Sequence, residues 1–308
     1  MEASITLKKV GKLIRDKTIL AGLSFGVEKG SLVAIVGEND SGKSVLLKLL
    51  SGFENPNYGQ VFIHGLDMDK RRQETQKLIG YVPYETNLDP WLTLKQNIIF
   101  NAELYNIKYS DYSKKIEYFS SKLNLNPNLN EYAYRVSGGE QKKAMLIRAL
   151  IHDPDVLIMD EPTGFMDAES IRLTWDLIKD LKGEKSIIYV SNSLAEIEQA
   201  HDRILVFNEG RILMDGHLDK LLESTLDYHQ FQIEFTELTD DLYNKLKKIP
   251  TVVSPNRLDN TFHFYGRKRS VFFDVINGAS GHIMINLDVK NLGLRDLLDS
   301  EFAGKGLD

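Results

Sequence analysis

Apolar runs and helical spacing divide the chain into regions of different predicted structure. Residues 31–36, 156–159 and 186–190 are almost continuously apolar, which is typical of strands buried on both faces of a sheet. Between residues 85 and 150, apolar side chains recur at helical spacing among polar ones. The order of these regions predicts an α/β core that is interrupted by a helical subdomain at about 85–150.

The pattern changes after Gly216, where short alternating segments suggest a second domain. Strands are predicted at 231–235, 251–255, 261–265 and 282–287, and helices at 238–249 and 268–279. Their order, βαββαβ, predicts a small α+β domain of the ferredoxin-like type. We therefore expect domains at 1–217 and 218–308, joined by a helix-like segment at 217–225.

Residues 37–44, GENDSGKS, match the phosphate-loop pattern GxxxxGK[ST] between a predicted strand and a predicted helix. Gly37 and Gly42 give the backbone freedom to wrap around a polyphosphate, Lys43 would reach its oxygens, and Ser44 would bind Mg²⁺. The remaining loop positions expected to contact the nucleotide are Asn39, Asp40, Ser41 and Val45.

The apolar strand at 156–159 runs directly into two acids. Buried carboxylates need a cation or a catalytic task, so Asp160 is a candidate Mg²⁺ ligand and Glu161 a candidate base for the attacking water. Taken alone, the pair could equally be a helix N-cap or a solvated strand end. The phosphate loop upstream favours the catalytic interpretation.

Residues 135–167, RVSGGEQKKAMLIRALIHDPDVLIMDEPTGFMD, resemble the signature block of the ABC (ATP-binding cassette) ATPases, and the resemblance extends over about 5–216. It implies a P-loop NTPase fold with a RecA-like core, an N-terminal antiparallel β subdomain and a helical subdomain. It also implies a head-to-tail dimer, in which Ser137, Gly138 and Gly139 of one cassette face the γ-phosphate bound by the other. Asp167 would lie at the dimer interface.

Two departures from the family pattern concern residues expected in the catalytic site. Tyr84 stands where the family has a Gln that contacts the metal and the water, and a phenol is a poor Mg²⁺ ligand. Asn192 replaces the family's switch His and cannot carry its positive charge. Asp40 stands at a position that is usually Gly, and Ile14 falls near the place of the aromatic residue that stacks on adenine.

Composition limits the compartment and the partners. The 308 residues contain no Cys, no apolar run long enough to span a bilayer and no signal-peptide pattern at the start, which favours the cytoplasm. The net charge of −6 does not support nucleic acid as the main ligand. Any membrane role would come through a partner, with the chain peripheral on the inner face of the cell membrane.

The sequence leaves more than one function open. The first is the ATP-binding subunit of an ABC transporter, which hydrolyses Mg·ATP to drive an integral membrane permease subunit. Residues 291–306 resemble the terminal segment of ATPases that serve drug, antibiotic or polysaccharide exporters, so export is expected. The alternative is a slow or non-hydrolysing regulatory subunit, paired with a more typical cassette. A soluble ABC protein acting on ribosomes or DNA is disfavoured, because neither a second cassette nor a long coiled coil is present.

Overall fold

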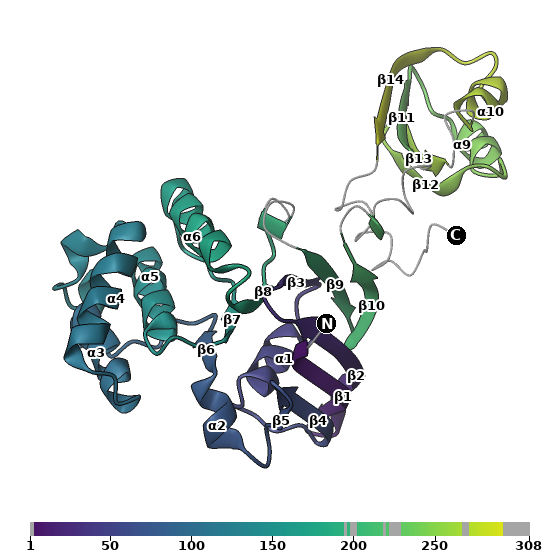
Figure 1. The fold of residues 1–308 in the computed structure, drawn as a ribbon. Coiled ribbons are helices and arrows are strands. Elements are labelled where there is room, and N and C mark those ends of the chain that lie inside the picture. Colours follow the sequence, from purple (N-terminus) through teal and green to yellow (C-terminus); the bar gives the residue numbers. More distant parts are fainter. Residues whose placement is uncertain are drawn as a thin grey trace. The chain divides into compact units, whose positions relative to one another are not determined.

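The chain folds as two compact units, Met1–Asp215 and Gly216–Asp308 (Figure 1). The computed structural model describes residues 3–193, 196–197, 202–217, 220–221, 229–266 and 271–291. The helix-like segment predicted at 217–225 and the terminal segment at 291–306 lie almost wholly outside the described residues.

An antiparallel sheet of strand order β2-β1-β4-β5 opens the first unit. Its strands are β1 (Ala3–Ile14), β2 (Lys17–Glu28), β4 (Tyr58–Ile63) and β5 (Leu66–Asp67). The long β1–β2 hairpin reverses at Arg15 and Asp16, which both have positive φ. The N-terminal antiparallel subdomain implied by the family resemblance is therefore present.

A six-stranded sheet of order β10-β9-β3-β8-β7-β6 forms the centre of this unit. The strands are β3 (Leu32–Gly37), β6 (Ile79–Val82), β7 (Val156–Asp160), β8 (Ser186–Val190), β9 (Arg203–Asn208) and β10 (Arg211–Gly216). Strands β6, β7, β8, β3 and β9 are parallel. Every residue of β7 and β8 is buried, as their continuous apolar sequence predicts.

The α-helices whose bounds the structure describes in the first unit fall into two groups of three. Three lie along the core: α1 (Lys43–Leu50), α2 (Arg72–Lys77) and α6 (Ala168–Leu181). The other three, α3 (Leu94–Leu104), α4 (Tyr109–Lys122) and α5 (Gly138–Leu150), pack on one another within the region predicted as the helical subdomain (Figure 1). Helix α5 also packs on β6, which connects this subdomain to the edge of the central sheet.

One apolar core fixes the position of α1. Leu46 and Leu50 of this helix are fully buried together with Ile35 and Ile158 of the central sheet and Ile63 of the antiparallel sheet. Because α1 packs against both sheets, its amino-terminal end is held at the carboxyl ends of the parallel strands. In open α/β sheets this edge is where ligands bind.

In residues 229–266 and 271–291 of the second unit, six elements follow one another in the order βαββαβ that the sequence predicts. They are β11 (His229–Phe235), α9 (Asp240–Leu246), β12 (Val253–Leu258), β13 (Thr261–Gly266), α10 (Val271–Gly278) and β14 (Met284–Asn291). The antiparallel sheet has the order β12-β13-β11-β14, and Phe231, Ile233, Phe262 and Phe264 form its core with the two helices.

Several boundaries differ from the sequence-based expectation. Strands β12 and β14 begin two residues later than predicted and extend further. Helix α5 begins at Gly138, because Ser137 and Glu140 form a capping box that lets the glycines enter the first turn. The chain turns between β9 and β10 at Glu209 and Gly210, which both have positive φ.

Candidate functional site

The phosphate-loop sequence joins β3 to α1 at the carboxyl edge of the central sheet. Two of its residues have positive φ, 63° at Asp40 and 101° at Gly42. A Cβ built on Gly37 would lie 2.0 Å from the carbonyl oxygen of Phe207, so glycine is required there for close backbone approach. Among the described residues no side chain caps α1, which leaves its first N–H groups to bind an anion.

Lys43 lies inside this loop with only 7% of its surface exposed. Its ammonium group donates to the carbonyl oxygens of Gly37, at 2.8 Å, and Glu38, at 2.5 Å. Burial lowers the pKa of Lys43, while the nearby carboxylates of Glu161 and Asp160 oppose that shift. The cation is thus placed beside acidic groups at the end of β7, where phosphate oxygens would complete its coordination.

Asp160 and Glu161 occupy different environments although they are adjacent. Asp160 is 3% exposed, and burial raises its pKa, while a hydrogen bond from the Ser44 hydroxyl opposes that rise. Burial, with Asp160 next in effect, raises the pKa of Glu161 to about 7. The backbone N–H of Asn192 bonds to the Glu161 carboxylate, and Glu161 Oε1 is buried without a hydrogen-bond partner among the described residues.

A cavity of about 840 Å³ brings most of the predicted site residues together. Its lining includes the predicted residues Asn39, Asp40, Gly42, Lys43, Ser44, Val45, Tyr84, Asp160, Glu161 and Asn192. Gly37 and Ser41 belong to the loop but do not line the cavity. Ser41 is 5% exposed, and its carbonyl oxygen accepts a hydrogen bond from the backbone N–H of Gly210. Ile14 is not among the lining residues, whereas Lys17 and Ile19 of β2 are.

The signature residues lie around a different hollow. Ser137, Gly139 and Asp167 line a cavity of about 340 Å³, and Gly138 is the first residue of α5, in contact range of Phe165. Ser137 Oγ accepts a hydrogen bond from the Glu140 backbone, and Asp167 caps α6 by accepting one from Ser170 at 2.8 Å. The chain therefore does not bring its own signature residues to its own phosphate loop.

The sequence did not reveal two buried polar groups beside this site. Lys142 is completely buried, and burial lowers its pKa to about 8. Glu196 accepts hydrogen bonds from Thr163, at 2.7 Å, and Ser191, at 3.0 Å, and so connects the segment after Glu161 to the one that carries Asn192. Charged residues at helical spacing suggest a solvated face, so no local signal distinguishes these two side chains from exposed ones.

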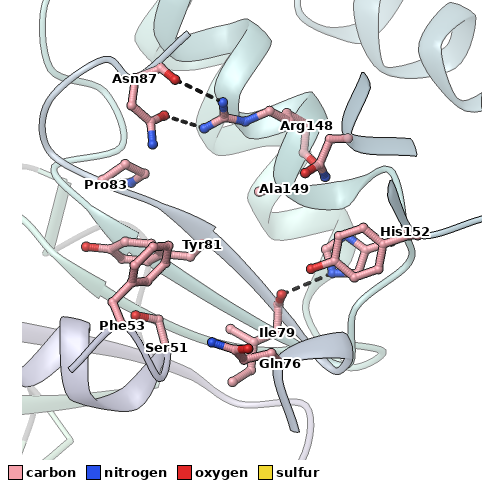
Figure 2. Close-up of a pocket in the computed structure, with 12 residues that line it drawn as sticks. Ser51, Phe53, Gln76, Ile79, Tyr81, Pro83, Asn87, Arg148, Ala149 and His152 are labelled. Atoms are coloured by element: carbon pink, nitrogen blue, oxygen red, sulfur yellow. Dashed lines mark hydrogen bonds between the residues drawn. The ribbon is translucent and has the colours of Figure 1, made fainter. Parts of the chain in front are cut away.

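A smaller cleft of about 370 Å³ lies beside β6 and is lined by residues of the core and of the helical subdomain (Figure 2). Its lining includes Tyr81, Asn87, Arg148 and His152, and the guanidinium group of Arg148 donates to the backbone carbonyl and the side chain of Asn87. The His152 ring stacks on Tyr105, at 4.0 Å between centroids, and lies 3.0 Å from the carbonyl oxygen of Ile79. This cleft is polar and lies at the junction between the core and the helices.

Comparison with known proteins identifies the family. Residues 20–164 match the model of the ABC transporter family. The chain is 32% identical over 219 residues to the ABC transporter ATP-binding protein NatA of Bacillus subtilis (strain 168), which covers 70% of this chain and 87% of that protein. It is 30% identical over 225 residues to the Nod factor export ATP-binding protein I of Burkholderia lata, covering 73% and 74% of the two chains.

Solved structures agree on the fold. The structure of an ATP-binding subunit of an ABC transporter has a TM-score of 0.67 at 24% identity and covers 71% of this chain and 92% of its own. A dimeric ATP-binding cassette bound to ADP and Pi has a TM-score of 0.64 at 23% identity, covering 70% and 98%. The chain belongs to the ATP-binding proteins of ABC transporters. It is a nucleotide-binding ATPase cassette of the kind whose hydrolysis is coupled to transport.

No helix in the described part of the chain is both long and apolar enough to cross a membrane.

The cleft beside β6 generates a prediction about stability. Burial lowers the pKa of His152 from 6.5 to about 4, so between these values the unfolded chain binds a proton that the folded chain does not. Stability should therefore decrease as the pH falls through this window, by about 3 kcal/mol from this residue. Urea unfolding of wild type and His152→Gln, each measured at about pH 7 and at about pH 4, should show a smaller loss in the variant. An identical loss of stability in both proteins would contradict a lowered pKa of His152 in the folded chain.

Proposed function

We propose that this chain binds and hydrolyses Mg·ATP at a head-to-tail dimer interface and drives a separate integral membrane subunit, in the direction of export. The observation that carries this proposal is the cavity of about 840 Å³, where the uncapped start of α1 and Lys43 face the acids at the end of β7. Helix N–H groups and an ammonium on one side, with carboxylates on the other, fit a polyphosphate bound with a cation.

Ser44 and Asp160 are the residues that fit Mg²⁺. The Ser44 hydroxyl bonds to the Asp160 carboxylate, so two oxygen ligands of the kind that Mg²⁺ prefers already lie side by side. Bound there, the ion would neutralise charge on the phosphoryl oxygens. The ion would also offset the unfavourable free energy of burying the Asp160 carboxylate, because that charge gains a partner.

Glu161 fits the role of general base. A catalytic base works best with a pKa near the operating pH, and burial with the neighbouring Asp160 raises the pKa of Glu161 to about 7. The Asn192 N–H orients the carboxylate, and the unpartnered Oε1 remains available to accept a proton from water. Asn192 can donate to a γ-phosphate through its side chain, and Tyr84 supplies a half-exposed phenol at the same cavity.

A second cassette would complete the site. Ser137, Gly139 and Asp167 line a separate hollow, with Gly138 beside them at the start of α5, so the phosphate loop would obtain signature residues from another chain. Residues of the second cassette beside the γ-phosphate would exclude bulk water and stabilise the phosphoryl group as it is transferred to the attacking water. Whether the second cassette is another copy or a different chain, the same two surfaces would meet.

A membrane subunit would dock near the cleft beside β6. Trp91 and Phe100 of the helical subdomain are 75% and 58% exposed, whereas Leu94 is part of the core. Large exposed aromatic residues are characteristic of protein interfaces. Export is supported by the names of the similar Nod factor export ATP-binding proteins, and the absence of a membrane-spanning helix from the described residues agrees with a separate permease.

The alternative function, a slow regulatory cassette, is favoured by a specific observation. Tyr84 and Asn192 line the nucleotide cavity, so both substitutions act at the reacting end and not at the periphery. Nucleotide binding would persist in such a subunit, while turnover would depend on a more typical partner cassette.

Removing the ammonium of Lys43 should weaken nucleotide binding. Lys43→Ala is expected to raise the Kd for Mg·ATP by about 10- to 100-fold, because the phosphate charge loses a buried hydrogen-bonded cation. Calorimetric titration checks this, with Lys48→Ala, on the exposed face of the same helix, as the matched control. Equal affinity of Lys43→Ala and wild type would refute the site assignment.

Neutralising Glu161 should separate binding from turnover. In Glu161→Gln, steady-state ATP hydrolysis should fall by about 100-fold or more, while Mg·ATP binding is retained, because the amide cannot accept the proton from water. Glu184→Gln, in the exposed turn before β8, is the control. Steady hydrolysis by wild type that this change abolishes would rule out the non-hydrolysing alternative.

Restoring an imidazole at position 192 tests the influence of Asn192. If Asn192 slows the reaction, Asn192→His should increase kcat at least severalfold, because a protonated ring can stabilise charge that an amide cannot. Single-turnover and steady-state rates of the purified chain measure this effect. A rate equal to or below that of wild type would show that Asn192 is not a brake.

A further inference from the structure

Lys142 is a fully buried cation whose location the ATP-binding role does not explain. It lies on α5 and forms no ion pair within 4 Å in the described part of the chain. Its ammonium donates instead to the carbonyl oxygens of Pro83, at 2.6 Å, and Asp160, at 3.1 Å. Burying an ammonium group is costly, so an uncharged side chain would be the cheaper choice for packing alone.

The two carbonyl groups belong to peptides that carry site residues. The Pro83 carbonyl belongs to the peptide that leads into Tyr84, and the Asp160 carbonyl to the one that leads into Glu161. These residues are 59 and 18 positions from Lys142 in the sequence. One ammonium group therefore connects α5, the signature helix that begins at Gly138, to both segments.

The hydrogen bond from Lys142 to the Asp160 carbonyl restrains the backbone at Glu161, the proposed general base. Glu161 has a φ of 47°, in the left-handed region that costs energy for a residue with a side chain. Its backbone N–H donates to the carbonyl oxygen of Val190 at 2.9 Å, while Lys142 holds the carbonyl of the same peptide. With both polar groups of this peptide bonded, the backbone from which the Glu161 side chain extends is held in place.

Lys142 also contacts the side chain of Tyr84 and so restrains the position of this ring. The ammonium lies 5.7 Å from the centroid of the Tyr84 ring, within the range of a cation–π interaction. The Phe165 ring is tilted against the same phenol, at 6.2 Å between centroids. Tyr84 is thus held by a cation on the signature helix and by an aromatic ring beside the dimer-facing Asp167.

We propose that Lys142 is a positioning residue, which fixes Tyr84 and Glu161 relative to the signature helix, so that a movement of that helix displaces both side chains at the nucleotide. This role rests on the proposed function, since it concerns the geometry of the same hydrolytic site. Lys142 itself touches neither water nor phosphate in this role; it acts through the two peptides and the phenol ring.

Amide hydrogen exchange tests the positioning directly and does not depend on turnover. In Lys142→Met, exchange should accelerate at Glu161 and in the segment that begins at Tyr84, because both peptides lose a buried donor. Lys185→Met is the control for the loss of a buried ammonium group: Lys185 is 8% exposed and donates to the Pro154 carbonyl at 2.7 Å and to the Asp153 carboxylate at 2.6 Å, at the opposite end of β8 from the cavity. Unchanged exchange at both segments in Lys142→Met, or equal acceleration there in Lys185→Met, would overturn the inference.

Kinetics then measure whether the positioning reaches the chemistry. Lys142→Met should lower kcat by about tenfold or more while the Kd for Mg·ATP changes much less, because a misplaced base affects the transition state and not the ground state. Lys142→Arg, which keeps a cationic donor, should recover part of the rate. A fall in kcat no larger than that of Lys185→Met would overturn the catalytic part of the proposal.

A double-mutant cycle tests the route through Tyr84. If Lys142 acts partly through this ring, the loss caused by Lys142→Met should be smaller when Tyr84 is already Leu. Independent, multiplying losses would overturn that route. A wild-type chain that binds no Mg·ATP would refute the proposed function instead, and the exchange measurement would still decide the positioning role.

Discussion

Two adjacent acids at the end of a buried strand impose the main constraint on this structure. Asp160 is the last residue of the buried strand β7, and Glu161 follows it directly. Carboxylates in such a place require cations or hydrogen-bond donors. Lys43 approaches from the phosphate loop, Ser44 from the start of α1, and the backbone of Asn192 from the end of β8. The arrangement of the cavity follows from satisfying these two charges.

The same constraint bears on the proposed need for a second cassette. The donors around the acids come from the carboxyl edge of the central sheet, while the signature residues begin α5 in the helical subdomain. Ser137 and Asp167 are already used locally as helix caps, which keeps both loops ordered at the surface. A surface that presents ordered caps and small residues is well suited to close on a second chain.

Much of the site follows from short sequence patterns. The phosphate loop was located from its spacing, and the acidic strand end gained its catalytic interpretation from that loop, because each depends on residues within one turn and its flanking elements. The signature segment was located from its resemblance to the ABC ATPases. The βαββαβ order of the second unit was also predictable from alternation. Boundaries were less predictable where a cap decided them: the Ser137–Glu140 box draws Gly138 and Gly139 into α5, although glycine has a low helix propensity.

The sequence by itself determined which residues are proposed to handle phosphate, since a glycine-rich turn, a lysine and two adjacent acids are recognised from their local pattern. Only the tertiary structure decided how these groups influence one another. The burial of Lys142, the raised pKa of Glu161 and the shared cavity of Tyr84 and Asn192 depend on contacts between segments far apart in the sequence. A lysine on a helix has the same local pattern whether it faces water or two backbone carbonyls, because burial is a property of the packed fold.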